Sequence, residues 1–310
     1  MIRLFLATLA LLLSAVPGWA APSYDLKPQQ IAPDTYVFMG STEHFTRANG
    51  GNILNPGFIV TDDGVVVIQT GPSRRFGEEM RAAIRTVTPK PIRIVYISNL
   101  HPDYFLGNQA FTDVPIAALP GTIAGIEREG HAITENMYRL VGDWMRGTDP
   151  VVPTQAVHGS TVVYGGHRLR LIPLEGHTHA DLALYDETTK VLFAGGVVFS
   201  DRTPTTPHAD VGKWLAALDT LESLDVAVLV PNHGRIRPDK GAIAQTRDWL
   251  TWLDGSLRTA AAQGRDMAEM LDAPIPERFA PLSMLRPEYQ RSVAHLWPAI
   301  EQETLPRVSK

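Results

Sequence analysis

The stretch YISNLHPDYFLGN, residues 96–108, holds the side chains whose types and spacing point most directly to chemistry. His101 and Asp103 are two residues apart, which suits two metal ligands in a turn between a strand and a helix. The flanking positions carry Asn99 and Tyr104. An amide and a phenol bind zinc poorly, because zinc prefers imidazole, thiolate and carboxylate ligands. The stretch therefore indicates either a metal site with an unusual ligand set or a loop that keeps only the shape of one.

The elements that would position this stretch alternate between strands and helices along the chain. Apolar runs bounded by turn residues predict strands within residues 34–40, 57–71, 92–100, 167–175, 181–196 and 226–234. Helical periodicity predicts helices over residues 73–87, 121–143 and 212–224 and over most of the chain from residue 239, the first of them capped by Ser73. This order predicts an α/β sandwich of sheets covered by helices, with the candidate site at the ends of strands.

The composition excludes some classes of protein and some chemistries. The 310 residues include 28 Lys and Arg and 33 Asp and Glu, so a net charge of −5 leaves no basic footprint for nucleic acid. A hydrophobic content of 44% is enough for a large core. The chain has no cysteine, which removes disulfides, a cysteine nucleophile and thiolate metal ligands.

The first twenty residues have the pattern of a signal peptide. Arg3 precedes an apolar run over residues 4–16, which is short for a membrane span, and small residues follow at Gly18 and Ala20. We expect cleavage after Ala20, a mature chain of residues 21–310 in the periplasm or outside the cell, and no membrane contact after removal. The alternative is an uncleaved N-terminal anchor.

Five motifs in a fixed order carry a family resemblance. VVVIQTG, SNLHPDYFLGN, LEGHTHADLALY, VLFAGGVVF and VPNHG follow one another as in the metallo-β-lactamase fold superfamily, which this chain resembles over nearly its whole mature length. The resemblance implies a four-layer αββα sandwich over residues 21–310, including a helical C-terminal region from about residue 239. The segment FTRANGGNILNPGFIVTDDGVVVI and the C-terminal helices further resemble the exported quinoprotein relay system zinc metallohydrolases.

Active members of that superfamily bind two zinc ions, and the resemblance assigns the ligand positions in this chain. They are Asn99, His101 and His177 for the first metal, Asp103, Tyr104 and His233 for the second, Gly196 for the bridging carboxylate, and Gln69 for a supporting carboxylate. Four of the eight positions, Gln69, Asn99, Tyr104 and Gly196, thus depart from the active pattern and are expected to line the pocket without binding metal. Asp103 is the candidate catalytic residue.

The substitutions argue against a dinuclear site. An amide oxygen is a neutral donor that suits calcium or magnesium better than zinc, and a phenol must lose a proton with a pKa near 10. Without a carboxylate at Gly196 nothing bridges two metals. A single zinc ion reaching His101, His177, His233 and Asp103 is the alternative, so we expect at most one zinc or none. His179 and Asp181 lie near the pocket in sequence and are weaker candidate ligands.

Each candidate also has an interpretation without function. The three histidines, taken singly, are as readily surface or hydrogen-bonded core residues. Asp103 precedes a predicted helix and could be its N-cap, and Tyr104 could pack in the core or contact a ligand. His44, in STEHFTRANGG, is a candidate substrate contact or an exposed loop residue, and His208 has the same two interpretations.

Three functional hypotheses follow. In the first, an exported protein has lost dinuclear zinc hydrolysis and binds a small molecule or a protein partner in the old pocket. The closer resemblance implies a periplasmic quinoprotein dehydrogenase or cytochrome system as the partner. In the second, the chain is a mononuclear zinc-dependent hydrolase of an ester, thioester or amide, with Asn99 or Tyr104 stabilising the oxyanion. In the third, the C-terminal helices form an interaction module.

Overall fold

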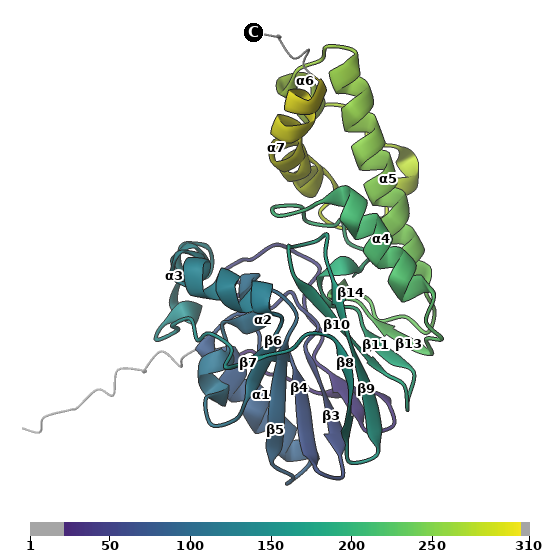
Figure 1. Cartoon of the computed structure of the whole chain (residues 1–310). Helices are drawn as coiled ribbons and strands as arrows, with labels where there is room; N and C mark the ends of the chain where they lie inside the picture. Colours follow the sequence, from purple (N-terminus) through teal and green to yellow (C-terminus); the bar gives the residue numbers. More distant parts are fainter. Residues whose placement is uncertain (1–21, 305–310) are drawn as a thin grey trace, which may run out of the picture.

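The computed structural model describes residues 22–304, and the signal peptide predicted for residues 1–20 lies outside them. Two β-sheets are stacked face to face, and helices cover both outer faces (Figure 1). The prediction of a four-layer αββα sandwich is therefore confirmed. None of the helices in the described part of the chain is both long enough and apolar enough to cross a membrane.

The first sheet has seven strands in sequential order. They are β1 (Gln29–Ala32), β2 (Thr35–Val37), β3 (Gly57–Thr61), β4 (Gly64–Ile68), β5 (Ile92–Ile97), β6 (Ile116–Ala118) and β7 (Gln155–Ala156). The pairs from β1 to β4 are antiparallel and those from β4 to β7 are parallel. Parallel neighbours need crossover connections, which α1 (Arg74–Val87) and α3 (Pro120–Val141) supply.

The second sheet has the strand order β13-β11-β10-β9-β8. Its strands are β8 (Ser160–Tyr164), β9 (His167–Leu174), β10 (Asp181–Asp186), β11 (Val191–Phe193) and β13 (Val228–Val230). A short parallel pair, β12 (Phe199–Ser200) with β14 (His233–Gly234), lies beside it. The longer helices on this side of the molecule are α4 (Val211–Glu222), α5 (Gly241–Ala262) and α7 (Leu285–Thr304), and α6 (Met267–Leu271) is short. The remaining helical segments are α2 (Pro102–Phe105) and the 3₁₀ turns η1 (Asn108–Phe111), η2 (Gly142–Met145), η3 (Gly195–Val197) and η4 (Glu277–Phe279).

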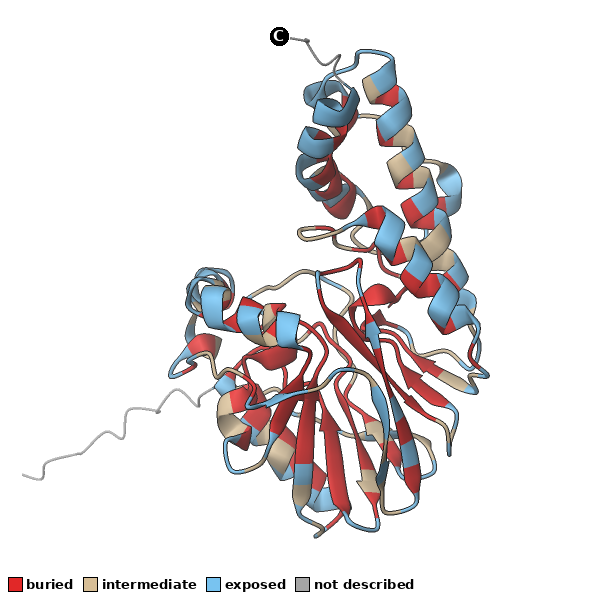
Figure 2. Cartoon of the chain, viewed as in Figure 1, coloured by how far each residue is buried: buried red, intermediate tan, exposed pale blue. Residues whose placement is uncertain are grey.

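The core has three parts because each sheet buries both faces (Figure 2). In β4 the side chains alternate as the strand period requires. Val65 and Val67 face the helices of the first sheet, whereas Val66 and Ile68 face the second sheet. Burying each of these side chains contributes about 1.5–3 kcal/mol, so the strands next to the site are held from both sides.

Local sequence signals set the boundaries of α1. The Ser73 hydroxyl accepts a hydrogen bond from the backbone N–H of Phe76 at 3.2 Å, which satisfies one free amide of the first turn. The helix ends at Val87, as predicted. The prediction that Asp103 caps the next helix is wrong, because His101 occupies the cap position of α2 and Asp103 lies inside its first turn.

The C-terminal helices reach back to the ends of the strands. The indole of Trp214 on α4 and that of Trp249 on α5 are both fully buried in the core of the second sheet. In α7, Glu288 is also fully buried and approaches the loop that follows β12. The helical region therefore contributes a wall to the site described next.

Candidate functional site

Four predicted ligand residues meet where strands of both sheets end. His101 and Asp103 follow β5, His177 follows β9, and His233 begins β14. All four are buried, with His101 the most exposed at 9%. We call these four residues the strand-end cluster. Its members form two pairs, and the pairs differ in which of their polar atoms have hydrogen-bond partners.

The first pair is His101 and His177, whose ring centroids are 4.6 Å apart with the rings at 75°. His101 Nε2 lies 3.0 Å from His208 Nδ1, so the two rings share a hydrogen bond. His177 stacks against Trp214 at 5.0 Å, and neither of its ring nitrogens has a hydrogen-bond partner in the described chain. Burial lowers the pKa of His177 well below its ordinary value, so the ring is neutral.

The second pair is Asp103 and His233, with Oδ2 and Nε2 3.5 Å apart. His233 Nδ1 is 2.7 Å from the carbonyl oxygen of Ile53, so Nδ1 carries the proton and donates it. Nε2 of the neutral ring then presents a lone pair toward Asp103. Among the described residues Asp103 Oδ2 has no hydrogen-bond partner, and burial raises the pKa of Asp103 to about 7. This pair can bind a proton or a cation between its two atoms.

The Asn99 amide is engaged within the protein. Its Oδ1 accepts from the backbone N–H of His101 at 3.0 Å, and its Nδ2 donates to Asp181 Oδ1 at 3.1 Å. Asp181 Oδ2 in turn accepts from the backbone N–H of Thr178 at 2.8 Å. Asn99 therefore ties the loop after β5 to the start of β10. Both of its polar groups are used in doing so.

Gly196 is packed so closely that a side chain does not fit. A Cβ atom at this position would lie 2.4 Å from His177 Nδ1, 2.5 Å from Asn99 Nδ2 and 2.8 Å from Asp181 Oδ1. Real Cβ atoms essentially never come within 3.0 Å of such neighbours. The Asp181 carboxylate, from the adjacent strand, thus lies beside the space that a bridging carboxylate at position 196 would enter.

Tyr104 and Gln69 are fully buried behind the loop. The Tyr104 hydroxyl has no hydrogen-bond partner among residues 22–304, and burial raises its pKa well above the ordinary value, so the phenol keeps its proton here. Gln69 has a left-handed backbone, with φ of 58°, and its Nε2 donates to Ser98 Oγ at 2.8 Å. Such a backbone is strained for a residue other than glycine, and the hydrogen bond holds the ends of β4 and β5 together.

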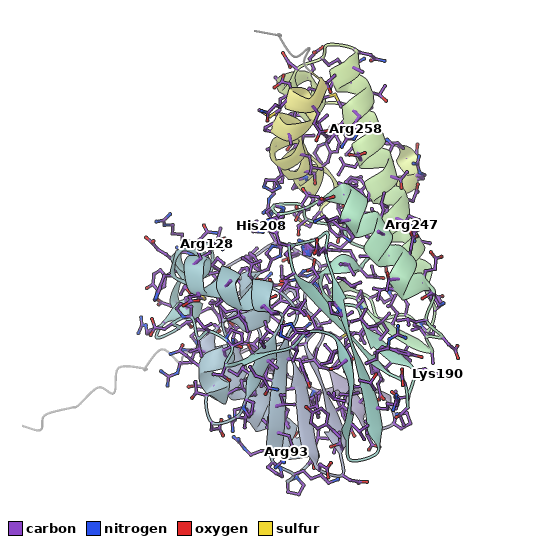
Figure 3. The ribbon with its side chains drawn as sticks, viewed as in Figure 1. Arg93, Arg128, Lys190, His208, Arg247 and Arg258 are labelled. Carbon is purple, nitrogen blue, oxygen red and sulfur yellow. The ribbon has the colours of Figure 1, made fainter. Side chains whose placement is uncertain are left out.

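A cavity of about 220 Å³ opens above the strand-end cluster. Its polar wall comprises His44, His101, His208, His233, Arg202 and Arg291, with Asp103, Asn136 and Thr205. Its apolar wall comprises Phe45, Ile53, Pro102, Ile133 and Pro207. His208 projects where the α3 side of the molecule faces the C-terminal helices (Figure 3).

Of the five predicted pocket residues, only His44 lines this cavity. Gln69, Asn99, Tyr104 and Gly196 are buried in the interior and are not among its lining residues.

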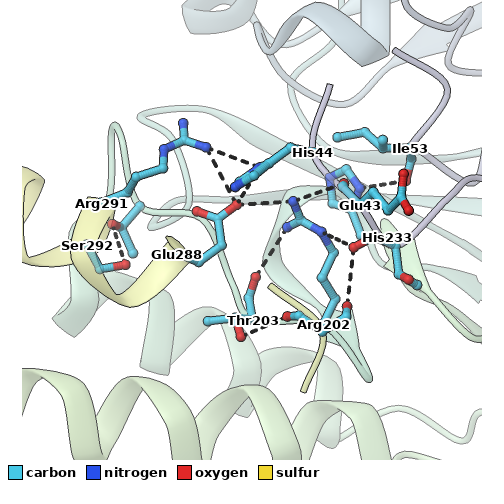
Figure 4. Close-up of polar contacts among 12 residues, drawn as sticks. Glu43, His44, Ile53, Arg202, Thr203, His233, Glu288, Arg291 and Ser292 are labelled. Carbon is cyan, nitrogen blue, oxygen red and sulfur yellow. Dashed lines mark hydrogen bonds and ion pairs between the residues drawn. The ribbon is translucent and has the colours of Figure 1, made fainter. Parts of the chain in front are cut away.

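A second polar group borders the same cavity (Figure 4). Arg202 follows β12 and Glu288 belongs to α7, and their Nη2 and Oε1 atoms are 3.1 Å apart with both side chains 1% exposed. His44 Nδ1 lies 3.3 Å from the same Glu288 oxygen, and Arg291 Nη1 lies 3.6 Å from it. We call His44, Arg202, Glu288 and Arg291 the arginine cluster. No short motif predicts it, because its residues come from three distant segments.

The two zinc ions implied by the sequence resemblance do not fit these residues. A catalytic zinc needs three protein ligands and an open position, and the described part of the chain has no group of three or more His, Cys, Asp or Glu placed to hold one ion. The two pairs of the strand-end cluster offer two donors each. Three of their buried atoms lack hydrogen-bond partners within residues 22–304, namely Asp103 Oδ2 and both His177 nitrogens.

Comparisons with known proteins agree on one fold. A family model described as the metallo-beta-lactamase superfamily matches residues 50–233. The linear primary-alkylsulfatase of Pseudomonas sp. (strain ATCC 19151) is 21% identical over 281 residues, which cover 76% of this chain and 53% of that enzyme. The chain thus spans about half the length of this curated relative.

Two solved structures give the same result. A metallo-beta-lactamase from Pontibacter korlensis superposes with a TM-score of 0.60 at 21% identity, covering 73% of this chain and 99% of that one. Metallo-beta-lactamase IND-7 has a TM-score of 0.59 at 17% identity, covering 74% of this chain and 100% of its own. At these identities the likeness concerns the fold alone.

Proposed function

The chain belongs to the metallo-beta-lactamase superfamily of hydrolase-fold proteins, and from that premise we propose that it has lost dinuclear zinc hydrolysis and binds a small molecule in the former active-site pocket. Members of the superfamily usually bind zinc. The proposal is that this chain keeps the strand-end loops of the family and uses the cavity above them for binding.

One observation carries the proposal: the packing around Gly196. A bridging aspartate there would bring its Cβ within 2.4–2.8 Å of His177, Asn99 and Asp181. These three buried side chains would have to move before a carboxylate could enter. A carboxylate that bridges two zinc ions roughly 3.5–4 Å apart helps to hold both cations, so this packing removes one support for a metal pair.

The experiment is a zinc measurement by inductively coupled plasma mass spectrometry on protein from zinc-supplemented expression. The expected result is no more than one equivalent of zinc per chain. Two equivalents that resist dialysis would overturn the proposal. His101→Ala and His177→Ala serve as controls, because zinc bound elsewhere on the surface persists in both variants.

Export and the quinoprotein setting are further parts of the proposal. Export is supported by the apolar run at residues 4–16 and the small residues before position 21. The setting is supported by the resemblance of residues 45–68 and of the C-terminal helices. Processing can be tested by N-terminal sequencing of protein from the periplasmic fraction. A mature chain that begins at Ala21 is expected, and an intact Met1 would contradict cleavage.

The buried atoms without hydrogen-bond partners favour a second candidate, a mononuclear zinc-dependent hydrolase. His233 donates from Nδ1 to a carbonyl and leaves Nε2 free, which is the usual arrangement of a metal-ligating histidine. Asp103 Oδ2 lies 3.5 Å from that nitrogen. This candidate predicts one equivalent of zinc that is lost in both His177→Ala and His233→Ala.

An activity screen then separates the two candidates. It should include p-nitrophenyl esters, thioesters, amides and, because the curated relative is named a linear primary-alkylsulfatase, primary alkyl sulfates. Turnover that requires the single zinc would establish the hydrolase. One zinc without turnover on these classes would favour binding.

A further inference from the structure

The positive charges at the cavity are not all balanced. Arg202 is neutralised by Glu288 at 3.1 Å, and its guanidinium also donates to the carbonyl oxygens of Thr42 and Thr203. Arg291 has no carboxylate of its own in the described chain, and its Nη1 lies 3.5 Å from the neutral ring nitrogen Nδ1 of His44. Its nearest carboxylate oxygen is the same Glu288 Oε1, 3.6 Å away and already bonded to Arg202.

The Arg291 side chain is also accessible. It is 48% exposed and lines the cavity from α7, whereas the Arg202 side chain is 1% exposed. The positive charge of Arg291 affects two histidines that belong to different elements. After the larger effect of burial, Arg291 helps to lower the pKa of both His44 and His295. His44, with a pKa of about 4, is neutral near pH 7 and adds no competing charge.

Apolar side chains also line the cavity. Ile133 comes from α3, Phe45 from the loop between β2 and β3, and Pro207 from the loop between β12 and α4. Figure 1 shows α3 beside the strand ends and α7 above them. A ligand in the cavity can therefore contact both a guanidinium and hydrocarbon.

We propose that this cavity binds a small amphiphilic anion, whose charged group pairs with Arg291 and whose hydrocarbon part packs against Phe45, Ile133 and Pro207. The cavity, at about 220 Å³, is smaller than the roughly 300–1,000 Å³ of pockets for drug-sized ligands. The ligand is accordingly short, of the size of a medium-chain carboxylate. The inference deepens the proposed binding function and rests on it.

The test is isothermal titration calorimetry with octanoate, butanoate and the neutral analogue 1-octanol. Octanoate is expected to bind one molecule per chain, at least tenfold more tightly than either of the others. The higher affinity of octanoate relative to 1-octanol measures the contribution of the charge. Its higher affinity relative to butanoate measures the contribution of hydrocarbon burial. Equal binding of octanoate and 1-octanol, or no octanoate binding at millimolar concentration, would overturn the inference.

Substitutions of Arg291 test whether its positive charge binds the anion. Arg291→Gln should weaken octanoate binding about 10–100-fold, as expected for loss of one charge-assisted contact, and leave 1-octanol binding unchanged. Arg291→Lys should retain part of the affinity. Arg286→Gln is the matched control, because Arg286 is on the same helix, lies over the Tyr289 ring and does not line the cavity. Unchanged octanoate binding in Arg291→Gln contradicts the proposal.

A final titration distinguishes an anion bound by Arg291 from an anion bound by a zinc ion. A carboxylate can also bind a zinc ion, so octanoate is titrated into protein before and after EDTA treatment. Affinity that survives EDTA but falls in Arg291→Gln supports the arginine site. Affinity that is lost with EDTA and unaffected by Arg291→Gln assigns the anion to metal and overturns the inference. The zinc count itself decides the proposed function independently.

Discussion

The strand-end cluster and the arginine cluster each contribute three residues to the lining of one cavity, but they differ in whether their buried polar atoms have hydrogen-bond partners. In the strand-end cluster, Asp103 Oδ2 and both nitrogens of His177 are buried without hydrogen-bond partners in the described chain. In the arginine cluster, Arg202 donates to backbone carbonyl oxygens on two segments and to a carboxylate on a third. Unpaired buried groups cost stability, whereas paired ones hold segments together.

This difference separates ligand binding from structural support. Atoms without partners are available to a proton, a water molecule or an ion, so the strand-end cluster keeps a capacity to bind. The arginine cluster connects α7 to the loop after β12 and leaves only Arg291 exposed enough to take part in binding. Each prediction below tests one side of this contrast.

The largest effect is expected for Glu288→Ala. The substitution leaves the Arg202 guanidinium, with a side chain 1% exposed, without its carboxylate. Breaking a buried ion pair by removing one partner typically costs 3–5 kcal/mol, so we expect a loss of about that size in the free energy of unfolding. Urea denaturation measures it.

The control for Glu288→Ala is Asp248→Ala. Asp248 pairs with Arg278 at 2.9 Å, and both side chains are about half exposed. A surface pair of this kind contributes about 0–1 kcal/mol. If the two variants lost similar stability, the arginine cluster would not be the structural support that its burial implies.

Gly196→Ala tests the packing of the strand-end loops. The new methyl group would lie 2.4–2.8 Å from three buried polar atoms, so the loops must shift. Overpacking of this kind costs about 1–3 kcal/mol. Gly255→Ala is a matched control for which the expected change in stability has the opposite sign. A Cβ at this exposed position in α5 meets nothing within 4 Å.

Alanine in place of glycine inside a helix is favourable by roughly 1 kcal/mol, so Gly255→Ala should raise the melting temperature while Gly196→Ala lowers it. A neutral Gly196→Ala would mean that the loops yield easily. In that case the packing argument against a bridging carboxylate would fail.

The sequence predicted most of the fold because its signals are local. Ser73 followed by a periodic segment marks α1, and the apolar runs around Asp63 mark β3 and β4 to within a few residues. The strand-end cluster was also found from sequence, since its members follow strands within ordered motifs. The interpretation of Asp103 as an N-cap failed because the helix begins at Pro102, two residues earlier than that cap would place it.

The rest depended on tertiary contacts that no local pattern encodes. Asn99 occupies a position that the family resemblance assigns to a metal ligand, and in the structure its amide donates to Asp181, which is 82 residues away in the chain. Arg202 and Glu288 are 86 residues apart, and nothing around either residue indicates the other. Only the return of α7 to the strand ends brings them together.

The smallest effect concerns His44 and the pH dependence of stability. Burial, with help from Arg202 and Arg291, lowers its pKa from 6.5 to about 4. Because the unfolded chain then binds the proton more readily than the folded chain, His44 should destabilise the fold progressively as pH falls from 6.5 to 4. Glu288 has the opposite effect on stability as the pH falls, since burial raises its pKa.

The contribution of His44 is therefore the difference in the free energy of unfolding between the parent and His44→Gln, measured by urea denaturation at several pH values. The parent should lose more stability than the variant over this interval. An identical loss in both would mean that His44 is solvated well enough to protonate freely, and that the field of the arginine cluster does not extend to the loop before β3.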